Sequence, residues 1–249
     1  MQDNPLENKV ALITGGARRI GARLAHTLHA AGMRLVIHYR SSDTDARALQ
    51  ADLQKLRDNS VALIQGDLLQ IDTTAKLIEQ AAAAFGRLDA LVNNASTYYP
   101  TPIGEATEQQ WNDLMGTNCK APFFLAQAAA PYLRETRGCI INMADIYGMR
   151  PLRSHPIYSS AKAALIMLTQ SLARELAPEV RVNAVAPGAI LWPEQGGDEK
   201  RQQQIIARTP LKRMGTPDDI TEAILWLLRD AAFVTGHVLA VDGGRSAAS

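Results

Sequence analysis

The sequence predicts one α/β domain built on a doubly wound parallel sheet of about seven strands, with helices on both faces. Short apolar runs alternate with longer segments of helical periodicity along the whole chain. Glycines follow the first apolar run, and polar motifs follow most of the later ones. With 249 residues, of which 47% are hydrophobic, the chain can bury one full core, so we expect residues 1–249 to form a single Rossmann-type domain.

The individual elements follow from this alternation. Strands are predicted at the short apolar runs, which are 9–14, 35–39, 61–64, 90–94, 139–143, 181–185 and 238–241. Helices are predicted where apolar residues recur every three or four positions, which is over 20–32, 45–57, 73–85, 107–133 with an interruption near Pro122, 158–172 and 217–229. Because strand–helix–strand crossovers are right-handed, the strands are expected to run parallel.

Composition excludes several classes of partner. Lys plus Arg number 26 and Asp plus Glu 25, so a net charge of +1 does not indicate a nucleic-acid-binding protein. The first nine residues are largely polar and charged, and no apolar run approaches the roughly 18 residues of a membrane span. The two cysteines, Cys119 and Cys139, show no metal or disulfide spacing. We therefore expect a cytoplasmic protein without a metal, nucleic-acid or membrane partner.

The first strand ends in a glycine-rich turn that joins it to a helix. Gly15-Gly16-Ala17-Arg18-Arg19-Ile20-Gly21 lets the backbone turn tightly and approach a pyrophosphate at the start of that helix. The alternative is an ordinary glycine-rich turn, which the strand–turn–helix context disfavours. Gly15, Arg18, Arg19 and Ile20 are therefore expected to contact a dinucleotide.

The end of the second strand bears on which dinucleotide is bound. It reads Tyr39-Arg40-Ser41-Ser42, without the acid that usually binds the ribose 2′-hydroxyl of NAD. Arg40 and the serines suit a 2′-phosphate, which favours NADPH. Asp43 and Asp45 lie close by, so this pattern alone leaves NAD open.

A third motif combines an acid, a tyrosine and a lysine. Lys162 follows Tyr158 by four residues, which places both on one face of a helix. An ammonium beside a phenol lowers the phenol pKa from its usual value of about 10, so Tyr158 is a candidate proton donor. Asp145 lies thirteen residues before the tyrosine, at the end of the fifth strand. The spacing occurs by chance on many helices, and it gains weight only beside the dinucleotide turn.

Together these motifs resemble the short-chain dehydrogenase/reductase family over essentially the whole chain. The resemblance implies that Tyr158 is the catalytic acid or base, that Lys162 binds the nicotinamide ribose and that Asn118 supports a proton path. Apolar residues over 114–133 and 165–176 exceed what one sheet face needs, as in family homotetramers. The resemblance also implies dinucleotide contacts at Asp67, Leu68, Asn94, Ala95, Ser96, Pro187, Gly188 and Ile190.

Two departures from the family pattern narrow the expected substrate. Arg19 stands where the family has a middle glycine, and Asp145 stands where it has a serine that donates a hydrogen bond to a carbonyl oxygen. An ionised carboxylate cannot donate that bond. Both departures are similar to the pteridine reductases, in which an aromatic residue at the place of Tyr98 stacks on the pterin. That resemblance implies substrate contacts at Arg19, Ser96, Tyr98, Asp145, Tyr158, Leu191 and Trp192.

The expected function is NADPH-dependent transfer of hydride to a C=N bond of a biopterin- or dihydrobiopterin-type substrate, with dihydrofolate as a further candidate. Residues 191–209 contain a proline and paired glycines and are expected to form a loop over the substrate. The alternatives are an NADPH-dependent reductase of another carbonyl or imine, such as a 3-oxoacyl thioester, and a dinucleotide-binding regulatory protein. The motifs do not distinguish one pterin from another.

Overall fold

The expected doubly wound sheet is confirmed by a computed structural model, which describes residues 4–191 and 199–247. Within these residues the sheet has seven parallel strands in the order β3-β2-β1-β4-β5-β6-β7. The order reverses direction between β1 and β4, which is the point at which open α/β sheets bind ligands. The strands are β1 Val10–Ile13, β2 Arg34–Tyr39, β3 Val61–Gln65, β4 Ala90–Asn93, β5 Cys139–Met143, β6 Arg181–Pro187 and β7 Val238–Val241.

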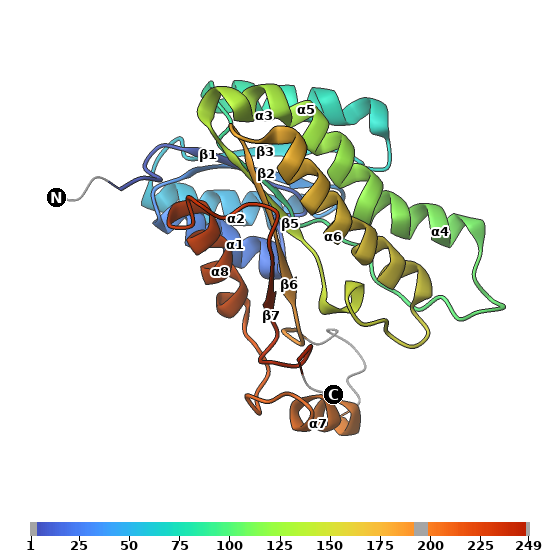
Figure 1. Cartoon of the computed structure of the whole chain (residues 1–249). Coiled ribbons are helices and arrows are strands. Elements are labelled where there is room, and N and C mark those ends of the chain that lie inside the picture. The colour runs from blue at the N-terminus through green and yellow to red at the C-terminus, as the bar shows by residue number, and fades with distance from the viewer. Residues whose placement is uncertain (1–3, 192–198, 248–249) are drawn as a thin grey trace.

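Helices cover both faces of this sheet (Figure 1). Helices α3, α5 and α6 lie on one face, and α1, α2 and α8 lie on the other. The helices are α1 Arg19–Ala30, α2 Asp43–Leu56, α3 Ile71–Phe85, α4 Glu108–Met115, α5 Ala121–Thr136, α6 Pro156–Leu176, α7 Glu199–Ala207 and α8 Pro217–Arg229.

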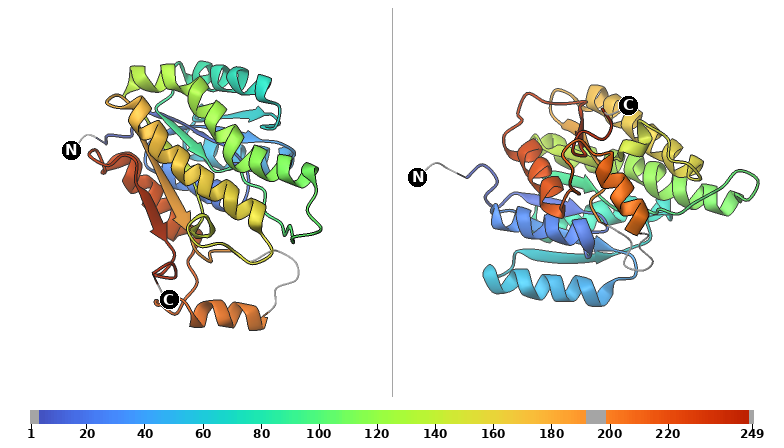
Figure 2. Two further views of the ribbon diagram at one scale, coloured as in Figure 1. Left: turned by 45° about the vertical axis from the view of Figure 1, so that its right-hand side comes forward. Right: turned by 90° about the horizontal axis from the view of Figure 1, so that it is seen from below.

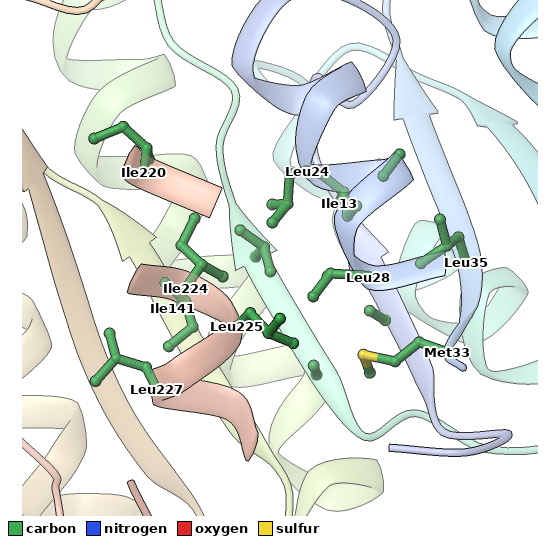
Figure 3. Packing of buried hydrophobic residues seen from close by; sticks show 14 of the residues in the cluster. Ile13, Leu24, Leu28, Met33, Leu35, Ile141, Ile220, Ile224, Leu225 and Leu227 are labelled. Carbon is green, nitrogen blue, oxygen red and sulfur yellow. The ribbon is translucent and has the colours of Figure 1, made fainter. Parts of the chain in front are cut away.

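The core consists of two apolar layers separated by the sheet. Neighbouring strand residues point to opposite faces, so Ile13 packs in the layer under α1 and α8 while Leu12 packs in the layer under α3 and α5. Figure 3 shows the first layer, in which Leu24 and Leu28 of α1 face Ile224 of α8. All five of these side chains are fully buried, which holds the strand ends in fixed positions.

The long helix expected over 107–133 is divided by a π-helical turn, Gly116–Lys120. The side-chain amide of Asn118 donates to the carbonyl of Leu114 at 2.9 Å and so competes with the regular helical bond to that carbonyl. Pro122 then lies in the first turn of α5, where its missing N–H is tolerated. The interruption expected near Pro122 is present, one turn earlier than the proline.

Residues 191–209 differ from the loop expected there. Glu199–Ala207 form helix α7, which lies beyond the carboxyl ends of β6 and β7 (Figure 2). Residues 192–198 lie outside the described part of the chain, and so does the expected substrate contact Trp192. The polar residues of 199–204 are followed by Ile205 and Ile206, an apolar pair that gives the helix one side to bury.

Two classes of feature are not found in the described ranges, 4–191 and 199–247. No helix there is both long and apolar enough to cross a membrane. No group of three or more His, Cys, Asp or Glu side chains there is arranged to hold a metal ion.

Candidate active site

Two cavities lie at the carboxyl ends of the strands. The larger has a volume of about 820 Å³ and extends from the end of β4 across β5 to the segment after β6. The smaller, of about 400 Å³, lies between the glycine turn and the ends of β2 and β3. Four residues line both and mark the boundary between them: Arg19, Ile20, Asn94 and Ser96.

The glycine turn is held close to the end of β4. Gly15 has a left-handed φ of +57°, and a Cβ at Gly21 would lie 2.5 Å from the carbonyl oxygen of Gly15. The side-chain amide of Asn94 donates to the carbonyls of Thr14 and Gly15 at 2.9 and 3.0 Å. These contacts require glycine at both positions and leave the start of α1 open to a pyrophosphate.

Arg19 adopts a backbone conformation that usually belongs to glycine. Its φ of +54° is left-handed, which costs a non-glycine residue about 1 kcal/mol or more. The side chain lines both cavities, so it places a positive charge between them. The backbone strain at Arg19 is therefore located where the two cavities meet.

The smaller cavity brings together the residues expected at the adenine, the adenosine ribose and the pyrophosphate. His38 also lines this cavity. Its Nδ1 accepts from the N–H of Gly15 at 3.2 Å, and its Nε2 donates to the carbonyl of Gly66 at 3.1 Å. Burial lowers the His38 pKa, which keeps this neutral tautomer. The predicted residues that line the cavity are Gly15, Arg18, Arg19, Ile20, Tyr39, Arg40, Ser41, Ser42, Asp67, Leu68, Asn94, Ala95 and Ser96.

The larger cavity contains the acid, the tyrosine and the lysine. The hydroxyl of Tyr158 donates to Oδ2 of Asp145 at 2.7 Å. The ammonium of Lys162 donates to the carbonyl of Met143 at 2.7 Å and lies 5.7 Å from the centre of the Tyr158 ring. The three side chains therefore meet where β5 ends and α6 passes over it.

The expected lowering of the Tyr158 pKa is wrong for this structure. Burial raises that pKa well above 10, and the carboxylate of Asp145 raises it further by charge and by hydrogen bonding. Burial also raises the Asp145 pKa, against hydrogen bonds from the N–H of Tyr147 and the Tyr158 hydroxyl. Burial lowers the pKa of Lys162 to about 8. The hydroxyl of Tyr158 contacts Asp145 directly, whereas the ammonium of Lys162 bonds to the carbonyl of Met143. The carboxylate therefore has the larger effect on the Tyr158 pKa.

A short 3-10 turn, Ile146–Gly148, fixes Asp145 against the catalytic helix. Oδ1 of Asp145 accepts from the N–H of Tyr147 at 2.8 Å, which leaves Oδ2 for Tyr158. A Cβ at Gly148 would lie 2.7 Å from the carbonyl carbon of Lys162. The turn therefore reaches its position only because residue 148 has no side chain.

Asn118 is buried and lines neither cavity, although it was expected in the proton path. Its Nδ2 donates to the carbonyls of Leu114 and Thr97, and its Oδ1 accepts from the hydroxyl of Ser96 at 2.6 Å. This places Asn118 one hydrogen bond behind a residue that lines both cavities. Ser96 opposes the rise in the Tyr158 pKa, so Ser96 lies between the amide of Asn118 and that tyrosine.

The remaining predicted residues also line the larger cavity. Pro187, Gly188 and Ile190 form its wall after β6, and the half-exposed Tyr98 forms part of the opposite wall. Leu191 lines the cavity at the last described position before α7.

The structure adds three residues that the motifs did not assign. His155 stacks on Tyr98, Ile205 of α7 lines the cavity, and Arg245 lies close enough to Asp145 to oppose the rise in its pKa. Ile205 and Arg245 are distant from the motifs in sequence, so only the fold brings them to the site. Of the three, only His155 lies near a motif in the sequence, because it precedes Tyr158 by three residues.

The geometry defines an oxidoreductase class. A parallel sheet with a glycine turn at its switch point is typical of dinucleotide-binding enzymes, and a tyrosine–lysine pair lies beside that turn at the strand ends. The chain belongs to the short-chain dehydrogenase/reductase family, as the sequence predicted. A family model described as enoyl-(acyl carrier protein) reductase matches residues 15–246.

Individual relatives in this family carry different activities in their names. Pteridine reductase 1 of Leishmania tarentolae is 34% identical, over 95% of this chain and 96% of that protein. A 3-oxoacyl-[acyl-carrier-protein] reductase of Staphylococcus aureus is 35% identical, over 95% and 97%. The crystal structure of a putative short-chain alcohol dehydrogenase from Sinorhizobium meliloti matches with a TM-score of 0.93 and 30% identity, over 99% of both chains. Overall identity therefore does not separate pterin from thioester substrates.

Proposed function

We propose that the protein is an NADPH-dependent reductase that transfers hydride to a C=N bond of a pterin, with Tyr158 as proton donor. The observation that carries this proposal is the hydrogen bond from the Tyr158 hydroxyl to the carboxylate of Asp145 at 2.7 Å. Both oxygens of Asp145 accept hydrogen bonds, so the position supplies an acceptor where a carbonyl reductase needs a donor. An amino-substituted heterocycle offers N–H groups to such an acceptor, whereas a ketone or thioester carbonyl does not.

The rest of the cavity also suits a flat, polar ring. Tyr98 presents a half-exposed aromatic ring, on which a planar heterocycle can stack. Arg19 at the opposite boundary suits the carbonyl oxygen of such a ring and the pyrophosphate together. A cavity of about 820 Å³ is large enough for both the nicotinamide and a bicyclic ring.

Proton delivery follows from the arrangement of Tyr158 and Asp145. When bound, NADPH supplies the hydride that reduces the carbon of the C=N bond. The Tyr158 hydroxyl then gives its proton to the ring nitrogen, so one hydride and one proton are added in total. The carboxylate of Asp145 holds the hydroxyl in position through the 2.7 Å hydrogen bond, and a proton from solvent restores Tyr158 before the next turnover.

The smaller cavity favours a 2′-phosphate over a free ribose hydroxyl. The two acids that kept NAD open in the sequence have other partners. Asp43 accepts from the Tyr39 hydroxyl at 2.6 Å and pairs with Arg47, and Asp45 pairs with Arg18 at 3.7 Å. Arg40 lines the cavity and forms no ion pair with another residue of the described ranges. The start of α2 adds free N–H groups beside it.

Dinucleotide affinity is expected to depend on the charge of Lys162. Its pKa is about 8, so the ammonium proposed to bind the nicotinamide ribose is lost as the pH rises from 7 to 9. We expect NADPH binding, followed by its fluorescence, to weaken by up to about tenfold between these pH values. The variant Lys162→Met has no charge to lose, so its weaker affinity should stay flat over the same range. An equal pH dependence in both proteins would exclude this role for Lys162.

The substrate assignment can be tested by comparing three classes of acceptor. We expect NADPH oxidation with dihydrobiopterin and little or none with simple ketones or a 3-oxoacyl thioester, because only the pterin matches an acceptor at residue 145. NADH should support the reaction poorly, since it has no 2′-phosphate for Arg40. Thioester turnover without pterin turnover would instead support the activity named for the staphylococcal relative. Tight NADPH binding with no turnover of any acceptor would support a regulatory protein.

The homotetramer, the cytoplasmic location and a lid function for residues 191–209 stay predictions. Trp111, Phe123 and Met167 on α4, α5 and α6 expose large apolar side chains, as expected for a surface that meets other subunits. The position of Ile205 on the cavity wall supports a covering role for α7.

A further inference from the structure

The aromatic ring of Tyr98 is held in place by two residues from the start of α6. It stacks on the imidazole of His155, with ring centres 4.8 Å apart and an angle of 14° between the planes. It also meets the ring of Tyr158 edge-on, at 4.9 Å and 79°. Tyr98 is 51% exposed, whereas His155 is only 7% exposed. An exposed ring supported by a buried ring forms a fixed flat surface at the cavity wall.

His155 is itself fixed by its surroundings. Its Nδ1 donates to the carbonyl of Arg153 at 2.9 Å, and because a carbonyl only accepts, this nitrogen carries a proton. The adjacent carbonyl of Ser154 accepts from the N–H of Thr101 at 2.7 Å, which ties the segment before α6 to the segment that bears Tyr98. The imidazole therefore supports Tyr98 from a segment that is bonded to the loop of Tyr98.

The imidazole has no other structural task that explains its position. His155 is the N-cap residue of α6, but its side chain makes no capping hydrogen bond to the helix. Only its backbone carbonyl serves the helix, by accepting from the N–H of Ser159 at 3.0 Å. Replacing the side chain would therefore remove the stacked ring and leave the helix start intact.

We propose that His155 is a positioning residue that fixes the Tyr98 ring as the stacking surface for a planar heteroaromatic substrate. Identifying that substrate as a pterin rests on the function proposed above. Since His155 and Tyr158 belong to the same helix start, the stacking surface and the proton donor keep a constant separation. His155 thus fixes the surface on which the substrate ring stacks.

Three variants test the role of His155. We expect His155→Ala to raise the KM for dihydrobiopterin by about three- to tenfold, the range typical of one lost aromatic contact. kcat should change less than KM, and NADPH affinity should not change. His155→Phe retains a flat ring without the Nδ1 hydrogen bond and should restore KM to within about twofold of the wild type. His237→Ala, at a histidine that lines neither cavity, is the matched control and should behave as the wild type.

A double-mutant cycle separates support of Tyr98 from direct contact with the substrate. If His155 acts through Tyr98, then His155→Ala should have no further effect once Tyr98→Ala is present. Equal effects in both backgrounds would overturn the proposal, and so would an unchanged or lower KM in His155→Ala alone. Fluorescence quenching by a diaminopteridine measures the same cycle without turnover. Wild-type protein that reduces no pterin would contradict the proposed function, whereas wild-type turnover with an unaffected His155→Ala variant would contradict only this inference.

Discussion

Replacing Tyr158 by Phe is expected to lower kcat for the pterin by about 10²- to 10⁴-fold, the usual contribution of a positioned proton donor. The variant keeps the ring that Tyr98 meets edge-on and removes only the hydroxyl that donates to Asp145. NADPH affinity should stay within a fewfold of the wild type, because Tyr158 does not line the smaller cavity. Steady-state turnover and NADPH fluorescence measure the two effects separately.

Removing the Tyr158 hydroxyl also changes the surroundings of the buried Asp145 carboxylate, so the stability of the variant has to be controlled. Without the hydroxyl, Asp145 keeps the N–H of Tyr147 but loses its second donor, which costs about 1–3 kcal/mol if the carboxylate stays charged. Thermal unfolding should therefore be measured beside activity, with and without NADPH. A folded, NADPH-binding Tyr158→Phe protein whose kcat falls less than tenfold would show that another group delivers the proton.

The fold was predictable because its signals are local. Leu12 and Ile13 lie in one short apolar run, and such a run is buried on both faces only when helices cover both faces of the sheet. Because the strands run parallel, β1, β4 and β5 all end at the same edge of the sheet, at Ile13, Asn93 and Met143. The site's location therefore follows from the order of the strands.

The finer chemistry was less predictable because it depends on contacts between distant segments. The four-residue spacing placed Lys162 near Tyr158 but did not show that the ammonium bonds to the carbonyl of Met143. The same spacing could not show that Asp145 is the charged group in contact with the hydroxyl, so the direction of the Tyr158 pKa shift was wrong. Arg245 follows the last strand and gives no periodic or motif signal of its contribution at Asp145.

The expected preference for a pterin over a carbonyl substrate depends most strongly on Asp145. Replacing Asp145 by serine is expected to reverse that preference. Asp145→Ser should lower kcat/KM for dihydrobiopterin by about 100-fold or more, because the cavity loses the acceptor for the ring and the carboxylate that holds the Tyr158 hydroxyl in position. NADPH affinity should survive, since Asp145 lines only the larger cavity. A serine can donate to a carbonyl oxygen, so turnover of ketones should rise above the wild-type level.

The variant Asp145→Asn is the matched control, because it keeps the shape and removes the charge. Loss of pterin turnover in both variants would show that the charge of the carboxylate matters, whereas retention in the asparagine variant alone would show that a neutral acceptor suffices. Removing the carboxylate also removes one cause of the high Tyr158 pKa. In both variants the alkaline limb of the pH–rate profile, where it reports ionisation of Tyr158, should therefore move to lower pH. Unchanged pterin turnover in Asp145→Ser would remove Asp145 from the mechanism. The preference for a pterin over a carbonyl would then have to come from Arg19, the other departure from the family pattern, and from the exposed ring of Tyr98.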